Sequence, residues 1–311
     1  MTSTDRPAAQ ASPPSDSRSL LVSVWASAAF AVLSLGWGLA IDSQMIIFDG
    51  LYSFVSVLLS LLAVLALRTV RKGADDSYPW GREVWEPLTI VLKSVALGGL
   101  CVYALVGAVG ELLRGGRMIN AGSAVAYAVL ASAGGLAVSV YLRQRSRGRS
   151  GLVRAEAAEW FGDTLLSLGV LVGFGIALVL ELTDRGDLAR FVDPAMVAIV
   201  SGAFLWVPLR LLTGGAREVL TMAPSVAIRE QLRACVDEVQ EQYGFSESFL
   251  RASKVGGRID IEIDFVVGES CAVRTVEQFD AVRDDIEQRL RSLDYQPWMT
   301  ISFTADRRWA L

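Results

Sequence analysis

The sequence contains no histidine among its 311 residues. This absence excludes catalysis by an imidazole and removes the commonest protein ligand of zinc. Its three cysteines, at positions 101, 235 and 271, are too far apart for a CxxC metal motif and do not suggest a disulfide framework. The net charge of −4 gives no indication of a nucleic-acid partner. Any site in this chain therefore has to be sought among other residue types.

Apolar residues are abundant, but they are unevenly distributed. The chain is 52% hydrophobic with a mean hydropathy of +0.42, and residues 19–213 are dominated by long apolar runs. A run of about 20 residues crosses a bilayer core of about 30 Å. We therefore expect a six-helix transmembrane bundle, with spans at about 19–41, 44–69, 87–113, 119–142, 153–181 and 193–213. The first 18 residues, rich in Ser, Pro and Ala, are expected to be disordered.

Basic residues near the ends of these spans predict the orientation in the membrane. Nine lysines and arginines lie around the loops between spans 2 and 3 and between spans 4 and 5 (68, 71, 72, 82, 143, 145, 147, 149 and 154). Four lie around the loops between spans 3 and 4 and between spans 5 and 6 (114, 117, 185 and 190). Loops rich in Lys and Arg stay in the cytoplasm. With six spans, both termini are then cytoplasmic, and we expect a multi-pass protein of the cytoplasmic membrane.

Residues 223–311 are charged and amphipathic, as in a soluble domain. The patterns predict an order of α-β-β-α-β, which is a small ferredoxin-like α+β fold. Gly256-Gly257 indicates a hairpin turn, and Thr275 with Gln278 indicates a capping box that opens a helix with Val276 on its buried stripe. Asp260, Glu262 and Asp264 form an acidic strand face, which favours a solvated surface over a calcium site.

Two of the expected membrane helices carry polar groups at helical spacing. In the fifth span, Glu156, Glu159 and Asp163 recur at i, i+3 and i+7 and so share one face. A carboxylate near the bilayer centre costs roughly 2.5 kcal/mol or more, so such groups need partners, protons or a bound cation. In the second span, Asp49, Tyr52 and Ser56 repeat the spacing.

Counting residues from the span ends places Ser56 and Asp163 near mid-membrane, so the two faces are candidates to form one cation site. The alternative is that these groups satisfy one another in a structural polar core. For Asp49 and Glu156, capping or structural hydrogen bonding is as plausible as ligation. Lys93, at a depth similar to that of Glu159, is either a counter-ion in the site or a lysine that extends to the headgroups.

Three segments resemble motifs of the cation diffusion facilitator (cation efflux) family, in the same order. They are residues 48–56 (FDGLYSFVS), residues 74–81 (ADDSYPWG) followed by 86–88 (EPL), and residues 153–171 (VRAEAAEWFGDTLLSLGVL). The resemblance covers nearly the whole chain after residue 18. It implies a homodimeric transporter rather than an enzyme, with six spans, cytoplasmic termini and the α-β-β-α-β domain as part of the dimer contact.

The resemblance also implies a metal site at Tyr52, Ser56, Glu159 and Asp163. Only Asp163 keeps the residue that is usual in the family. Tyr52 stands where the family has His or Asp, Ser56 where it has a second Asp, and Glu159 where it has His. Tyr78 and Arg82 replace the loop histidines, so the family's zinc site in that loop is expected to be absent.

Carboxylates and hydroxyls are hard donors, which suit Mn²⁺, Fe²⁺ or Mg²⁺ better than Zn²⁺. We therefore expect a secondary transporter that exports a divalent cation, coupled to proton entry, with the metal as substrate and no cofactor. A sensor or scaffold that no longer transports, and a transporter of a non-metal cation, are the alternatives.

Overall fold

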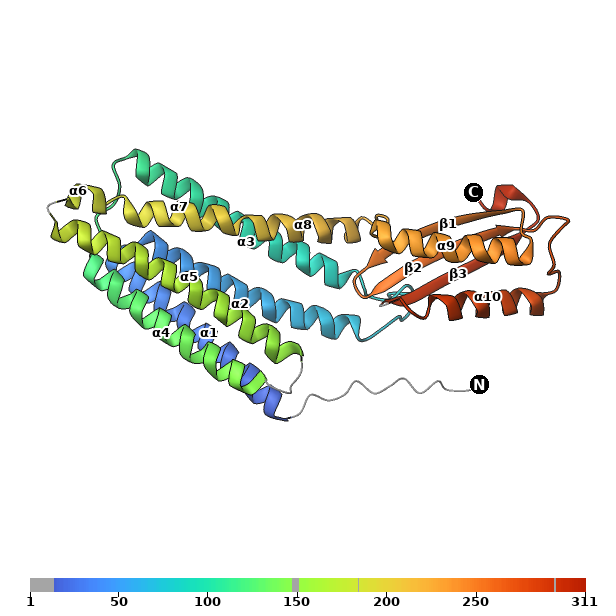
Figure 1. Ribbon diagram of the computed structural model, residues 1–311, viewed down its shortest axis with the longest axis horizontal. Coiled ribbons are helices and arrows are strands. Elements are labelled where there is room, and N and C mark those ends of the chain that lie inside the picture. The colour runs from blue at the N-terminus through green and yellow to red at the C-terminus, as the bar shows by residue number, and fades with distance from the viewer. Residues whose placement is uncertain (1–13, 147–150, 184, 294) are drawn as a thin grey trace. The chain divides into compact units, whose positions relative to one another are not determined.

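A computed structural model describes residues 14–146, 151–183, 185–293 and 295–311, and it leaves out the side chains of residues 14–21, 145–146 and 151–159. Its long helices are drawn in Figure 1: α1 (Pro14–Ile41), α2 (Gln44–Val70), α3 (Trp85–Leu113), α4 (Ala121–Ser146) and α5 (Gly151–Leu182). Together with the segment Gly186–Val219, they make six helical segments that are long and apolar enough to cross a membrane. The expected six-span bundle is therefore confirmed.

The ends of the spans differ in detail from the expectation. Helix α1 already begins at Pro14, within the segment expected to be disordered, and the rest of that expectation (residues 1–13) falls outside the described residues. Proline at the first position of a helix is favourable because its missing N–H would have no partner there. The sixth segment consists of α6 (Gly186–Ala189), α7 (Val192–Phe204) and α8 (Trp206–Val219). The break at Leu205 lies just before Pro208, which cannot donate a hydrogen bond to residue 204.

By its contacts the chain divides into two compact units, Met1–Leu61 with Val95–Pro208, and Leu62–Ser94 with Leu209–Leu311. In the first unit, α1 and α2 approach each other closely at two glycines. A Cβ on Gly50 would lie 2.8 Å from the backbone nitrogen of Leu35, and one on Gly38 would lie 2.8 Å from that of Ile47. Small residues of this kind let membrane helices pack backbone to backbone. The residues next to these glycines are thereby brought together as well.

The second unit contains the expected α-β-β-α-β fold (Figure 1). Helix α9 (Val226–Tyr243) is followed by β1 (Glu247–Val255), β2 (Arg258–Val266), α10 (Val276–Leu290), β3 (Gln296–Thr304) and a short 3₁₀ helix, η1 (Arg307–Trp309). The sheet order is β1-β2-β3, with β1 antiparallel and β3 parallel to β2. The hydrophobic core lies between the sheet and the two long helices and is built on Ile259, Ile261, Ile263 and Phe265 of β2.

Local signals in this domain are mostly confirmed. The hairpin turn occupies Gly256-Gly257, and Thr275 and Gln278 form the capping box at α10. The buried position expected for Val276 is wrong, because its side chain is 70% exposed. Val276 is the first residue after the cap, where the helix has not yet turned its apolar stripe onto the sheet.

The acidic face of β2 is neutralised by arginines. Arg251 of β1 donates to Asp264 (Nη1 to Oδ2, 2.9 Å), and Arg258 donates to Asp260 (Nη2 to Oδ2, 3.3 Å). Asp264 is only 4% exposed, so this face is less solvated than expected. Arg251 also donates to the carbonyls of Ala310 and Leu311, which fixes the end of the chain against β1.

An arginine also organises the loop between α2 and α3. Arg82 is buried and donates to Asp75 (Nη2 to Oδ2, 2.5 Å) and to the carbonyl of Gly73 (2.7 Å), and its guanidinium lies over the ring of Tyr78. The hydrogen bond from Arg82 holds the pKa of Asp75 below its ordinary value of 3.8. The loop is thus closed by a guanidinium, which supplies a fixed positive charge.

Candidate functional site

A cavity of about 110 Å³ lies within the first unit, between α1, α2, α4, α5 and α7. Seven of the described side chains that line it carry oxygen: Ser27, Asp49, Tyr52, Ser53, Ser56, Asp163 and Ser167. The rest of the wall is apolar or aromatic and includes Phe48, Trp160 and Phe204. A small polar cavity within an apolar helical unit is the usual form of an ion or ligand site in a helix bundle.

Two helices supply most of the oxygens, for a simple geometric reason. On α2, Asp49, Tyr52 and Ser56 lie on one face because they are three and four residues apart. On α5, Asp163 and Ser167 are one turn apart and line the same cavity. The structure therefore brings together four of the residues singled out from the sequence, three from the second span and Asp163 from the fifth.

Three lining serines were not anticipated. Ser53 lies four residues after Asp49, and Ser167 lies four residues after Asp163, so the same spacing argument could have found both. Ser27 lies on α1, which carries no acidic residue within the membrane and so gave no such signal.

The remaining predicted site residues are not placed in the cavity. Glu156 and Glu159 belong to α5, but their side chains lie outside the described residues. Lys93 on α3 is partly buried, is not among the residues that line the cavity, and makes no hydrogen bond or ion pair with any described residue. Its two readings, as counter-ion or as a lysine extended to the headgroups, stay predictions.

Asp49 is held by a tyrosine hydroxyl of another helix, which in turn contacts a serine hydroxyl of a third. The Tyr127 hydroxyl of α4 donates to Oδ2 of Asp49 (2.9 Å), and the Ser34 hydroxyl of α1 lies 2.6 Å from that of Tyr127. Ser34 and Asp49 are the chain neighbours of Leu35 and Gly50, at one of the two close approaches of α1 and α2. The glycine contact thus brings both groups within reach of one tyrosine.

The tyrosine itself is fixed by packing. Tyr127 is 2% exposed, and its ring lies against those of Phe30 and Trp37 on α1, at centroid distances of 6.5 and 6.2 Å. Trp37 in turn donates to the carbonyl of Ser123, one turn before Tyr127 on α4. Side chains locked in this way hold their polar ends in one position.

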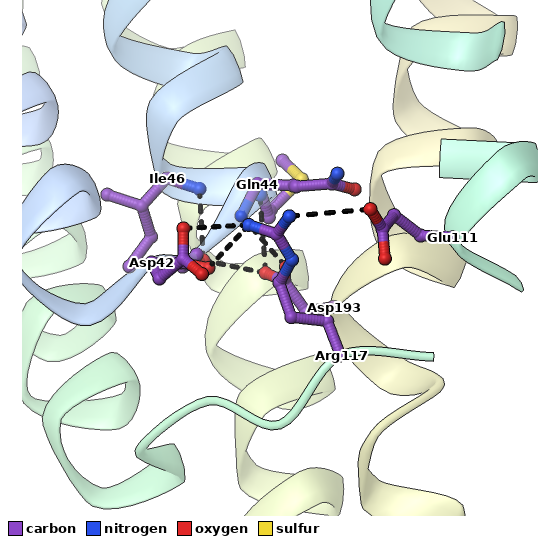
Figure 2. Close-up of polar contacts among 8 residues, drawn as sticks. Asp42, Gln44, Ile46, Glu111, Arg117 and Asp193 are labelled. Carbon is purple, nitrogen blue, oxygen red and sulfur yellow. Dashed lines mark hydrogen bonds and ion pairs between the residues drawn. The ribbon is translucent and has the colours of Figure 1, made fainter. Parts of the chain in front are cut away.

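A second buried acid, Asp193, lies at the opposite end of α2 from the α2–α3 loop (Figure 2). It accepts hydrogen bonds from the Ser43 hydroxyl (2.6 Å) and from the backbone N–H groups of Gln44 (2.8 Å) and Met45 (3.2 Å). Asp193 therefore caps the start of α2 from α7, together with Ser43, whose hydroxyl accepts from the backbone N–H of Ile46 (3.3 Å). Beside it, Arg117 is paired with Asp42 (2.7 Å) and Glu111 (3.4 Å) (Figure 2). This cluster does not line the cavity and has a structural role.

The donor set of the cavity favours hard cations. No histidine or cysteine lines it, and within the described ranges no three His, Cys, Asp or Glu side chains gather into a metal cluster. Among the described side chains, the donors are two carboxylates and five hydroxyls, which suit cations that prefer oxygen. A cation held here by the described side chains would be bound by neutral hydroxyl oxygens as well as by carboxylates.

Comparison with known proteins identifies relatives of this chain. Residues 20–220 match the model of the cation efflux transmembrane domain. The "Uncharacterized transporter YdbO" of Bacillus subtilis is 22% identical over 275 residues, which cover 87% of this chain and 89% of the relative. The "Manganese efflux system protein MneP" of the same species is 20% identical, over 64% and 67% of the two chains. The "Magnetosome protein MamM" of Paramagnetospirillum magneticum is 27% identical, over 78% and 73%.

Proposed function

The chain belongs to the cation efflux family, and on that premise we propose that it is a secondary transporter that exports a divalent metal cation by proton antiport. Membership makes it a multi-pass membrane protein that transports metal cations, and not an enzyme. The cation is accordingly its substrate and not a cofactor.

The observation that carries the proposal is the cavity between α2 and α5. Asp49, Tyr52 and Ser56 of α2 and Asp163 of α5 line it. Three of the four residues that the family's two-plus-two arrangement implies, Tyr52, Ser56 and Asp163, are among them. We assign Asp163 the central role in binding, with Ser56 and Tyr52 as neutral oxygen donors. Glu159, four residues before Asp163 on α5, is proposed as the second carboxylate that balances a divalent charge.

Hard cations are the preferred substrates in this proposal. Oxygen donors suit Mn²⁺, Fe²⁺ and Mg²⁺ better than Zn²⁺, which is usually bound by nitrogen or sulfur. The name of the manganese efflux relative supports the same assignment. We propose Mn²⁺ as the first cation to test.

Proton coupling would use the carboxylates of the site. Carboxylates that balance a divalent cation can instead hold protons, so Asp163 and Glu159 would exchange the cation for protons. In this scheme the cation leaves when protons enter from the acidic side. We further propose that the protein lies in the cytoplasmic membrane as a homodimer, with both termini in the cytoplasm and the α-β-β-α-β domain in the dimer contact.

Transport by purified protein in proteoliposomes tests the proposal. Wild type should take up Mn²⁺ and release protons, as recorded by a metal-sensitive dye and a pH-sensitive dye in the same vesicles. Asp163→Asn should abolish both signals. Glu181→Gln, which removes an exposed carboxyl at the far end of the same helix, should leave them unchanged.

The same assay separates the alternatives. Binding of Mn²⁺ without uptake would favour a sensor or scaffold over a transporter. Competition by Fe²⁺, Mg²⁺, Zn²⁺ and polyamines against Mn²⁺ uptake then ranks the substrates. Stronger competition by a polyamine than by any metal would favour an organic cation, and retained uptake in Asp163→Asn would contradict the site.

A further inference from the structure

Tyr127 does not line the cavity, yet its hydroxyl contacts Asp49, one of the acids that do. It is not among the lining residues, and its ring fills the core between Phe30 and Trp37. A phenylalanine would fill the same space, so packing alone does not explain the hydroxyl. The hydroxyl contacts Oδ2 of Asp49 at 2.9 Å and the Ser34 hydroxyl at 2.6 Å.

The hydroxyls of Tyr127 and Ser34 donate to different acceptors. A phenol has one hydrogen, and that of Tyr127 is donated to Asp49. Ser34 also has one hydrogen, which it donates to the carbonyl of Phe30 (2.8 Å), and its oxygen lies 2.6 Å from that of Tyr127. The Tyr127 hydroxyl is therefore in contact with the carboxylate on one side and with the Ser34 hydroxyl on the other. One oxygen of Asp49 is thereby held by a donor that cannot move.

We propose that Tyr127 is a positioning residue for the transported cation, which acts through Asp49 and is supported by Ser34. It holds Oδ2 of Asp49, so that the carboxylate offers its other oxygen to the cavity as a single ligand for a hard divalent cation or its water. The proposal rests on the cation transport proposed above and adds a group that is outside the cavity. It also gives Asp49 a role distinct from that of Asp163.

The test is a comparison of Tyr127→Phe with wild type in Mn²⁺ uptake by proteoliposomes. The variant keeps the ring and its packing and removes the hydroxyl alone. We expect KM for Mn²⁺ to rise roughly tenfold, the scale found when a group that orients a metal ligand is removed, with the maximal rate changed less than about twofold. Tyr103→Phe is the matched control, because Tyr103 on α3 is 77% exposed and its hydroxyl contacts neither Asp49 nor Ser34; its KM should equal that of wild type.

A second background decides whether Tyr127 acts through Asp49. The double variant Asp49→Asn, Tyr127→Phe should have the same KM for Mn²⁺ as the single variant Asp49→Asn. An equal rise in KM in both backgrounds would show a general effect on packing and would overturn the proposal, as would an unchanged KM in Tyr127→Phe. Failure of wild type to take up Mn²⁺ would instead overturn the proposed function, and this inference with it.

Ser34→Ala provides an independent route if the tyrosine variant does not fold. Ser34 contacts the Tyr127 hydroxyl and not the carboxylate, so we expect a smaller rise in KM, of roughly threefold. Ser201→Ala is its control, because Ser201 is equally buried but donates only to the carbonyl of Val197 on its own helix. A rise in KM of the same size in both serine variants would contradict the proposal.

Discussion

Two acids of the C-terminal sheet and two buried acids of the helical unit have different kinds of partner. In the C-terminal sheet, Asp264 is held by Arg251 and Asp260 by Arg258. In the helical unit, Asp49 accepts from the Tyr127 hydroxyl, and Asp193 accepts from the Ser43 hydroxyl and two backbone N–H groups. The sheet thus uses cations to hold its acids, whereas these two helical acids are held by neutral donors.

This difference has a functional consequence. A carboxylate paired with arginine has its charge cancelled permanently, because the guanidinium does not lose its proton. A carboxylate held by hydroxyls is fixed in place but keeps its negative charge. Only an arrangement of the second kind leaves charge available for a passing cation. The comparison therefore predicts that a fixed cation in the cavity would stop transport.

The largest effect is expected from placing such a cation there. Ser53 lines the cavity one turn from Asp49, and Ser53→Lys would bring an ammonium group to the acids. We expect Mn²⁺ uptake to fall by at least about 100-fold, because the ammonium group competes with the cation for the carboxylates and a loss of about 2.7 kcal/mol in cation binding corresponds to that factor. Ser53→Met, of similar length and without charge, is the control and should keep most of the activity. Equal activity of the two variants would contradict the comparison.

Removal of Asp193, which is also held by neutral donors but lies outside the cavity, should affect stability instead. Asp193→Ala removes the part of the α2 cap that α7 supplies and leaves a buried hydroxyl and two N–H groups without their acceptor. We expect a loss of about 2–3 kcal/mol in the free energy of unfolding, since a lost cap costs about 1 kcal/mol and buried unpaired groups add to it. Thermal unfolding measures this loss. Asp187→Ala, at an exposed acid of α6, should be neutral, and a similar loss in both would refute the capping role.

A smaller effect is expected when the sheet loses an arginine. Arg251→Met leaves Asp264 buried without its charged partner, and we expect a loss of about 1–2 kcal/mol, because Arg251 itself is partly exposed. Arg251→Met with Asp264→Leu should recover part of it, since an apolar pair leaves no buried charge. Thermal unfolding again reports the change, with Arg291→Met at an exposed position as the control. No recovery in the double variant would argue against charge pairing as the cause.

The smallest effect concerns the α2–α3 loop and its pH dependence. The pKa of Asp75 is lowered in the folded protein, so its pairing with Arg82 adds stability above pH 3.8 that is lost as the pH falls through the folded pKa. Arg82→Met should return the pKa of Asp75 toward 3.8. Carbon-13 NMR of labelled aspartate, compared with an Asp75→Asn sample for assignment, measures it. An unchanged pKa in Arg82→Met would show that the arginine is not the cause.

Much of the fold follows from patterns that are local in the sequence. Long apolar runs predict the spans, and alternation along β2 with the Gly256-Gly257 turn predicts the hairpin. The faces of α2 and α5 follow from helical spacing, which is why Asp49, Tyr52, Ser56 and Asp163 could be named in advance. Their use as ligands remains a proposal.

The partners of these residues could not be predicted, because they depend on contacts between distant segments. Nothing in the sequence near Tyr127 or Ser34 indicates Asp49, since the contact arises where Gly50 lets α2 approach α1. Asp193 followed by Pro194 reads as the start of its own helix, yet its carboxylate caps α2. Contacts of this kind are set by helix packing, which no local pattern encodes.

The position of bound Mn²⁺ tests the central claim most directly. Crystals of the protein soaked in Mn²⁺, measured at a wavelength where manganese scatters anomalously, would locate the ion. The account predicts a peak in the cavity between α2 and α5, roughly 2 Å from an oxygen of Asp163 and bound by further oxygen donors. Absence of manganese from the cavity under conditions that support transport, with Asp163 bonded only to fixed protein donors, would contradict it.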